Sequence, residues 1–278
     1  MIWQCGRHRM AWQGTPWIMG ILNVTPDSFS DGYPTVEAAL KQAHRLIEDG
    51  ADMVDIGGES TRPGSLGIGV DEELARILPV IRALRRAFDI PLSVDTQKPE
   101  VARIAIAEGI DVVNHVSASL DYQAMLPVIA ASEVGYVAMH MRERPKSMQR
   151  NPDYKDPVEE VTRALQRVGD AAKEQGIAPK RLIYDPGIGF GKKLAHNLAL
   201  MKNLDVMGDR LGRPLLLGIS RKSWLEHLLG PGIDPGGERD AHTAAATVLL
   251  DTDSVWCHRV HNVGLIKRAL ALGRALRS

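Results

Sequence analysis

The chain has 278 residues, in which 34 lysines and arginines balance 34 aspartates and glutamates. A net charge of zero provides no field that would attract nucleic acid or an anionic membrane, so we expect neither as a partner. The N-terminus lacks a long apolar core and no apolar run approaches the length of a membrane span, so we expect a cytoplasmic protein. Two cysteines, Cys5 and Cys257, are too few for a disulfide framework.

Short apolar runs recur along the chain, and each is followed directly by polar residues. Residues 1–16 precede these runs and alternate in a way that predicts a β-hairpin. The runs then follow at residues 18–22, 53–56, 91–94, 112–113, 136–139, 215–219 and 255–257, with one more ending at Tyr184. Helical patterns lie between them, most clearly at residues 36–48, 71–88, 157–175, 196–208, 239–250 and 264–276.

Eight buried strands that alternate with helices predict a (β/α)₈ TIM barrel, an α/β fold. We expect one domain over residues 1–278, with the hairpin of residues 1–16 plugging the bottom of the barrel. A doubly wound open sheet would alternate strand and helix in the same way. Polar residues at all eight strand ends favour the closed barrel, because an open sheet uses mainly the crevice at its switch point.

The polar residues that follow the runs are the candidate site, since the carboxyl ends of barrel strands form one face. They include Asn23, Arg62, Asp95, Asn114, His140, Asp185, Lys222, Arg259 and His261. The segments at residues 23–32 and 59–65 are too polar to be core and predict loops over that face. Taken singly, each such residue is more often a helix cap or a solvated turn. Their convergence at one face favours a functional site.

The residue types at these strand ends suggest two kinds of ligand group. The carboxylates of Asp95 and Asp185, with the amide of Asn114, match a flat heterocycle that carries amino and ring N–H donors. The cations Arg62, Lys222 and Arg259, with His261, suit a phosphate, a pyrophosphate or a carboxylate. There is no His-x-x-x-His pair, so any metal would be a hard ion held by oxygen, such as Mg²⁺. His140 is equally compatible with a core position and with a ligand contact.

Six segments of the chain carry a resemblance to a known family, in the order in which that family has them and across nearly the whole chain. They read ILNVTPDSFSDG, DIGGESTRPGS, SVDTQKPEVA, YDPGIGFGK, GISRKS and RVH. The chain resembles the dihydropteroate synthases, the pterin-binding family of the folate pathway. The resemblance implies a cytoplasmic homodimer that uses Mg²⁺ and is a sulfonamide target. It also implies a transferase that joins (7,8-dihydropterin-6-yl)methyl diphosphate to 4-aminobenzoate, giving 7,8-dihydropteroate and diphosphate.

The same resemblance implies a role for each matching residue. Asn23 would hold Mg²⁺, and the catalytic residues would be Asp95, Lys222, Arg259 and His261. The pterin diphosphate would be bound by Thr61, Arg62, Asp95, Asn114, Asp185, Lys222, Arg259 and His261. The 4-aminobenzoate would contact Phe29, Thr61, Pro63, Phe190, Lys222 and Ser223.

The chain departs from the family's pattern at a few positions. His115 and Asn262 each stand where the family usually has aspartate, Ala118 and Ser119 replace a glycine pair, and Tyr33-Pro34 replaces a glycine-rich continuation. These departures leave open a pterin-binding paralogue with weak or no synthase activity. A methyltetrahydrofolate-dependent methyltransferase is a further alternative, although it would not need a cationic clamp for diphosphate. Because Asn262 precedes a helical pattern, we expect it to cap that helix.

Overall fold

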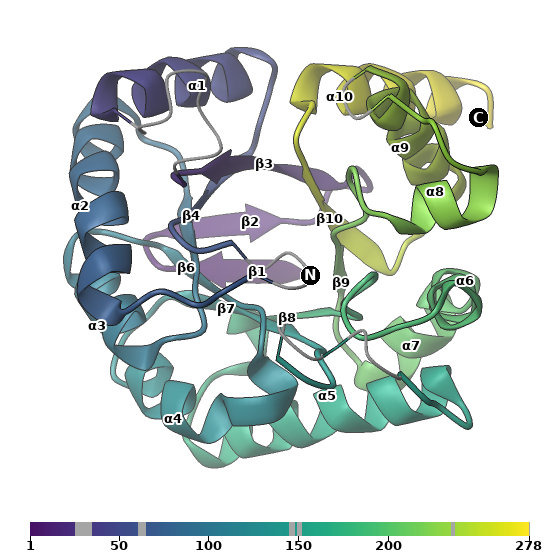
Figure 1. Cartoon of the computed structure of the whole chain (residues 1–278). Coiled ribbons are helices and arrows are strands. Elements are labelled where there is room, and N and C mark those ends of the chain that lie inside the picture. The colour runs from purple at the N-terminus through teal and green to yellow at the C-terminus, as the bar shows by residue number, and fades with distance from the viewer. Residues whose placement is uncertain (26–34, 61–64, 145–147, 149–151, 235–236, 278) are drawn as a thin grey trace.

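The computed structural model describes residues 1–25, 35–60, 65–144, 148, 152–234 and 237–277. Eight parallel strands close into a barrel in the order β10-β3-β4-β5-β6-β7-β8-β9, with the helices around them (Figure 1). The strands are β3 (Trp17–Asn23), β4 (Met53–Gly57), β5 (Leu92–Asp95), β6 (Val112–His115), β7 (Gly135–Met139), β8 (Leu182–Asp185), β9 (Leu215–Leu217) and β10 (Val255–Val260). The predicted TIM barrel is therefore confirmed over the open sheet.

The helices of the described residues cover the outside of the barrel. They are α1 (Val36–Glu48), α2 (Val70–Ala87), α3 (Pro99–Ala107), α4 (Ala118–Ala130), α5 (Pro157–Glu174), α6 (Leu194–Met201), α7 (Leu204–Leu211), α8 (Trp224–Leu229), α9 (Gly237–Leu249) and α10 (Val263–Ala275), with a 3₁₀ turn η2 (Pro179–Arg181) before β8. Across these described ranges, no helix combines the length and the apolar composition that crossing a bilayer requires.

The predicted single helix over residues 196–208 is wrong, because the chain forms two helices there. α6 ends at Met201, and Asn203 leaves the helical conformation before α7 begins. The Asn203 side chain donates a hydrogen bond of 2.8 Å to the carbonyl of Ala199. That bond satisfies a terminal carbonyl of α6 and competes with a continued helix. The apolar period runs across the break because both helices pack on the same barrel.

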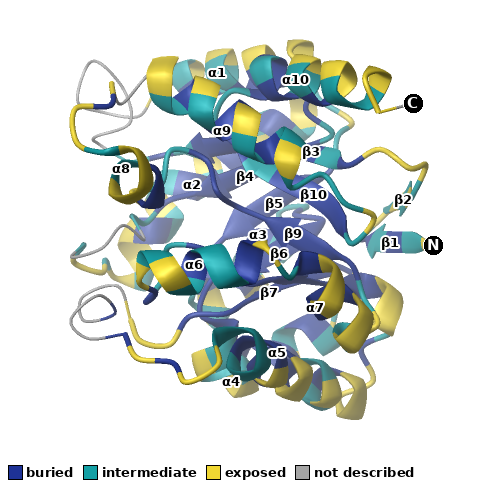
Figure 2. Ribbon diagram, turned by 90° about the vertical axis from the view of Figure 1, so that its right-hand side faces the viewer, coloured by how far each residue is buried: buried dark blue, intermediate teal, exposed yellow. Residues whose placement is uncertain are grey.

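An N-terminal hairpin, β1 (Ile2–Cys5) paired with β2 (His8–Ala11), closes one end of the barrel. Trp3 is fully buried against apolar residues of the barrel interior, and its indole N–H donates to the carbonyl of Arg181 at 3.0 Å. Cys5 and Cys257 are free thiols in the same apolar cluster. Figure 2 shows the hairpin at one end of the barrel and α8 at the other. The predicted plug is confirmed, and it leaves the opposite mouth for chemistry.

Candidate active site

Asp55, inside β4, is the centre of a charged cluster at the mouth of the barrel. Its Oδ2 accepts from Arg259 Nε at 2.6 Å and from Asn114 Nδ2 at 3.1 Å. A terminal nitrogen of Arg259 donates to Asp95 Oδ2 at 2.7 Å. One guanidinium on β10 therefore joins carboxylates from β4 and β5, and this pairing compensates the burial of their charges.

The sequence analysis did not identify Asp55 as a site residue, although a signal was available. Asp55 has no exposed surface and shares a face of β4 with Met53, which packs in the barrel interior. Side chains two residues apart on a strand point the same way. The carboxylate of Asp55 within the apolar run 53–56 indicates a charged residue inside the barrel.

Two carboxylate oxygens of this cluster lack a hydrogen-bond partner among the described residues. Asp55 Oδ1 and Asp95 Oδ1 are buried and accept no hydrogen bond from any described part of the chain. Burial raises the pKa of Asp95 to about 7, with Arg259 opposing the rise and Asp55 adding to it. A carboxyl with a pKa near neutrality in a mouth is a mark of a functional site.

Asp185 and Lys222 form the second half of the site, across from Asp55. Asp185 Oδ1 accepts from the backbone N–H of Gly187 at 2.7 Å. A Cβ on Gly218 would lie 3.6 Å from Asp185 Oδ2 and 3.9 Å from Lys222 Nζ, so both side chains lie against this glycine. Burial lowers the pKa of Lys222 to about 8 against the opposing effect of Asp185, and burial raises the pKa of Asp185 against that of Lys222.

Phe190 and Ser223 flank Lys222. The Lys222 ammonium lies 4.4 Å from the centre of the Phe190 ring and donates to the carbonyl of Ile188. Cation and ring attract each other at this distance. Ser223 is exposed and directly precedes α8. A flat, partly apolar wall thus stands beside a cation, which suits an aromatic carboxylate.

His261 is oriented by Ser220, and Arg221 points away from the mouth. His261 Nδ1 lies 3.0 Å from Ser220 Oγ, which fixes the imidazole at the end of β10. Arg221 makes a two-point ion pair with Asp240, at 2.6 and 2.7 Å, and has a positive φ of 56°. Arg221 therefore anchors the turn that carries Ser220 and Lys222.

Asn23 ends β3 beside the carboxylate cluster. A Cβ on Gly57 would lie 3.5 Å from Asn23 Oδ1 and 3.7 Å from Asp95 Cβ, so the two side chains flank the same glycine. In the described ranges, no group of three His, Cys, Asp or Glu residues could hold a metal ion. Phe29, Thr61, Arg62, Pro63 and the Tyr33-Pro34 departure lie outside the described residues, so their roles stay predictions.

His115, which stands where the family usually has aspartate, does not face the barrel mouth. Alternation along β6 points Asn114 into the barrel and His115 toward α4. His115 Nδ1 lies 2.8 Å from the Tyr136 hydroxyl and Nε2 lies 2.9 Å from Asp121 Oδ1. Since this fully buried histidine contacts none of the proposed ligand residues, the departure leaves the mouth intact.

The other described departures are also structural. Ser119 Oγ donates to the carbonyl of Met141 at 2.6 Å and ties α4 to the segment after β7. Ala118 begins α4 with no exposed surface. Asn262 Oδ1 accepts from Leu265 N at 3.1 Å, so the predicted cap of α10 is confirmed.

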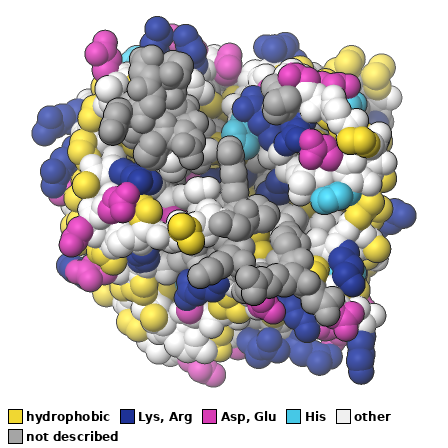
Figure 3. Space-filling view, in the orientation of Figure 1, with side chains coloured by type: hydrophobic (Ala, Val, Ile, Leu, Met, Phe, Trp, Pro, Cys, Tyr) yellow, Lys and Arg dark blue, Asp and Glu magenta, His cyan; other side chains and the backbone are white. Residues whose placement is uncertain are grey.

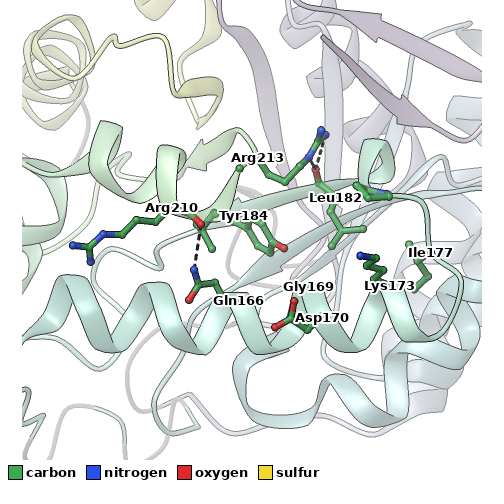
Figure 4. A pocket seen from close by; sticks show the side chains of 12 residues that line it. Gln166, Gly169, Asp170, Lys173, Ile177, Leu182, Tyr184, Arg210 and Arg213 are labelled. Atoms are coloured by element: carbon green, nitrogen blue, oxygen red, sulfur yellow. Dashed lines mark hydrogen bonds between the residues drawn. The ribbon is translucent and has the colours of Figure 1, made fainter.

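A hollow of about 380 Å³ lies apart from this cluster, between α5, α7 and β8 (Figure 4). Tyr184 lines it, whereas its neighbour Asp185 belongs to the mouth. Figure 3 looks onto the end of the barrel that carries α8 and shows Lys and Arg interspersed with Asp and Glu around the rim.

Known proteins share both this sequence and this fold. The pterin binding enzyme family matches residues 19–261. The chain belongs to the pterin-binding enzyme family. Dihydropteroate synthase of Neisseria meningitidis serogroup B is 41% identical over 281 residues, which cover 99% of this chain and 97% of that protein. Dihydropteroate synthase of Synechocystis is 39% identical over 98% of this chain and 93% of its own length.

Solved members of the family have the same barrel. The structure of Xanthomonas albilineans dihydropteroate synthase with 4-aminobenzoic acid has a TM-score of 0.90 and 42% identity, and covers 100% of this chain and 98% of its own. The same enzyme in complex with 7,8-dihydropteroate has a TM-score of 0.85 and 38% identity, again covering 100% of this chain and 98% of its own. The predicted function is confirmed: the chain is an enzyme of the dihydropteroate synthase type, a transferase.

Proposed function

We propose that the mouth of this barrel condenses (7,8-dihydropterin-6-yl)methyl diphosphate with 4-aminobenzoate, giving 7,8-dihydropteroate and diphosphate. The observation that carries the proposal is the cluster in which Arg259 joins Asp55 and Asp95, with Asn114 on the same carboxylate. This cluster combines carboxylate oxygens, which accept from N–H groups, with the fixed cation of Arg259. The structures of the X. albilineans enzyme with 4-aminobenzoic acid and with 7,8-dihydropteroate support the choice of substrates.

The pterin is proposed to lie flat across the mouth, between the carboxylates of Asp95 and Asp185. The amino and ring N–H groups of the pterin would donate to Asp95 and Asp185, while Asn114 and Lys222 would bind the remaining edge. Asp55 is added to this set, because it orients both Asn114 and Arg259. A heterocyclic base would be recognised here through its N–H donors when Asp55 and Asp95 are ionised, since the oxygens of an ionised carboxylate only accept.

The leaving diphosphate is proposed to meet Arg259 and His261, together with Thr61 and Arg62. Arg259 uses Nε and one terminal nitrogen on carboxylates, and its other terminal nitrogen donates to no described protein atom. As the C–O bond breaks, the diphosphate takes the electron pair, and the Arg259 guanidinium, held in place by two carboxylates, stabilises its charge. Asp95 stabilises the positive charge that develops on the pterin methylene carbon.

The 4-aminobenzoate is proposed to bind between Phe190 and Ser223, with Phe29, Thr61 and Pro63 completing the site. Lys222 would pair with its carboxylate or with the pterin that it faces. The amine nitrogen forms the new C–N bond to the methylene carbon and loses one proton as the neutral secondary amine forms. A site that closes over this step keeps water from attacking the same carbon.

Mg²⁺ is proposed to be held by Asn23 and by oxygens of the substrate diphosphate. The amide oxygen of Asn23, next to the Asp95 carboxylate, is a hard oxygen donor of the kind Mg²⁺ prefers. The bound ion would neutralise charge on the departing diphosphate. Calorimetry of pyrophosphate binding should show affinity that requires Mg²⁺ in the wild type and is weakened in Asn23→Ala. Equal pyrophosphate affinity with and without the ion would contradict this assignment.

The decisive experiment measures diphosphate release and the mass of the product with both substrates present. Diphosphate and 7,8-dihydropteroate should appear in equal amounts, and neither should form when 4-aminobenzoate is left out. Pterin binding without product would instead identify a non-catalytic paralogue. Transfer of a methyl group from methyltetrahydrofolate, with no diphosphate released, would identify the methyltransferase alternative.

We further propose that the chain is one domain and that it acts as a cytoplasmic homodimer. Leu249 on α9 and Leu272 and Leu276 near the end of α10 are largely exposed on adjacent helices, which supplies apolar surface for a second copy. Sedimentation equilibrium should give twice the chain mass, and Leu272→Lys should shift the protein toward the monomer. A monomer at all concentrations would contradict the dimer.

A further inference from the structure

Lys192 is buried, with 4% of its surface exposed, directly after the glycine-rich segment 186–191. Its ammonium donates to the carbonyls of Gly187 at 2.9 Å and Phe190 at 3.0 Å, and to His140 Nδ1 at 3.0 Å. The carbonyl of His140 is a longer fourth contact at 3.4 Å, and the three closer acceptors match the three N–H donors of an ammonium. Burial lowers the pKa of Lys192 to about 7, with Asp185 opposing the fall, so the side chain is held in place by these hydrogen bonds and not by solvent.

His140 is suited to accept this bond. Burial lowers the pKa of His140 well below its usual value, and the nearby Lys192 lowers it further. The imidazole is therefore neutral at physiological pH, with one ring nitrogen able to accept. The question that the sequence left open for His140 is answered: it is a hydrogen-bonded buried residue at the end of β7.

The segment between Asp185 and Lys192 depends on such external support. Gly187, Gly189 and Gly191 have φ values of 68°, 84° and 59°, and this left-handed backbone forms neither helix nor strand. A Cβ on Gly187 would collide with the carbonyl oxygen of His140, which shows how closely the segment lies against β7. Lys192 cross-links the two sides of this contact.

The same segment carries two groups of the proposed substrate site. The Phe190 ring lies against Lys222, and the Ile188 carbonyl accepts from the Lys222 ammonium. A shift of the segment would therefore move the aromatic wall and reorient Lys222 together. Displacements of this kind are costly for a reacting ligand even when the displaced group does no chemistry.

We propose that Lys192 is a positioning residue for the second substrate, because its ammonium locks segment 186–191 onto His140 and so sets the places of Phe190 and Lys222. This inference rests on the proposed function, in which those two residues border 4-aminobenzoate. Asp185 is bonded to the same segment through Gly187 N but is held independently by β8. The pterin side of the site should therefore depend much less on Lys192.

Lys192→Met tests this by keeping the length of the side chain and removing its N–H donors. The KM for 4-aminobenzoate should rise about tenfold or more, while the KM for the pterin diphosphate changes by less than about twofold. The neighbouring exposed Lys193→Met loses the same charge one residue away and should leave both constants unchanged. Unchanged KM for 4-aminobenzoate in Lys192→Met, or an equal rise in both constants, would overturn the proposal.

A double-mutant cycle with Phe190 distinguishes positioning from a general loss of structure. If Lys192 acts through the ring, Lys192→Met should add little to the 4-aminobenzoate KM of Phe190→Leu. Additive effects would refute that route. Should Lys192→Met not fold, His140→Phe removes one of the three acceptors and must still raise the KM for 4-aminobenzoate selectively. Turnover of the wild type separates the two possible failures. If the wild type has no turnover, the proposed function is wrong. If it turns over normally and the variants leave the KM for 4-aminobenzoate unchanged, only the role of Lys192 is wrong.

Discussion

Asp95 is the residue at which burial and chemistry conflict most directly. Its pKa is raised to about 7, so between pH 4 and pH 7 the folded chain binds more protons at this position than the unfolded chain does. Stability from this group therefore falls as pH rises through that window. A buried carboxyl that lowers stability when it ionises is a candidate for a functional role.

We predict that Asp95→Asn lowers turnover at least about tenfold, or about 1.4 kcal/mol of barrier, because it removes the charge that opposes the developing cation. The variant should also show no loss of thermal stability at pH 8. It no longer buries the negative charge of Asp95, and Arg259 keeps its ion pair with Asp55. Steady-state diphosphate release and calorimetric unfolding measure the two effects. Turnover equal to that of the wild type would exclude the catalytic role.

Both the oxygen and the nitrogen of the Asn262 amide form hydrogen bonds, and an aspartate at this position could form only the first of them. Its oxygen caps α10, and its Nδ2 donates to Asp240 Oδ2 at 3.1 Å. This bond and the ion pair with Arg221 lower the pKa of Asp240 against the effect of burial. The Ser220 hydroxyl contacts the ring of His261.

Asn262→Asp should therefore lose about 1–2 kcal/mol of stability at pH 7, because it exchanges a donor for a second negative charge beside Asp240. The loss should shrink as pH falls and the carboxyls protonate, and turnover should stay within about twofold. Asn262→Ser, which keeps a capping oxygen without a charge, is the control. A several-fold rise in turnover would mean that the aspartate usual in the family tunes His261, and that the chain is a weakened synthase.

At the scale of elements, α5 approaches β8 closely at Gly169. A Cβ on Gly169 would collide with the Tyr184 hydroxyl, and both residues line the hollow in Figure 4. Glycine within a helix costs about 0.5–1 kcal/mol relative to alanine, so the close approach must outweigh that cost. The strand and the helix are thus matched in shape at one point.

Gly169→Ala should lower stability by about 1–3 kcal/mol through overpacking. In a Tyr184→Phe background the same change should cost less than about 1 kcal/mol, because the hydroxyl that blocks the Cβ has been removed. Chemical denaturation of the four proteins measures the coupling between the two positions. Equal losses in both backgrounds would show that the glycine is needed for another reason.

At the scale of the whole molecule, the barrel separates stability from function along its axis. The hairpin end buries Trp3 in an apolar cluster, while the opposite end carries the charged mouth. This division follows the general rule for barrels of this type. Damage at the plug should therefore be visible in unfolding and not in substrate binding.

Trp3→Ala should lose about 3–5 kcal/mol of stability, since it leaves a cavity at the base of the barrel and an unpaired carbonyl at Arg181. The KM for both substrates, measured at a temperature where the variant remains folded, should be unchanged. Trp12→Ala, a half-buried tryptophan stacked on Trp256, serves as the milder control. A large change in either KM would contradict the separation of the two ends.

The sequence was sufficient to predict the elements and the order in which they close. Eight apolar runs with polar ends are a local pattern, and burial on both faces of a parallel strand requires such runs whatever the neighbours are. The hairpin and the cap at Asn262 were readable for the same reason. The break between α6 and α7 was not, because the apolar period continues through Asn203 while its side chain ends the helix.

Only the tertiary structure decided which polar residues meet. Asp55 and Arg259 are 204 positions apart, and no local rule pairs them. Their ion pair exists because β4 and β10 both flank β3 in the closed barrel. Likewise His115 is directed away from the mouth by the pleat of β6, and Lys192 meets His140 only because the segments that follow β7 and β8 lie side by side. Hydrophobic periodicity is a property of consecutive residues, whereas the pairing of buried charges depends on contacts that form only when the barrel closes.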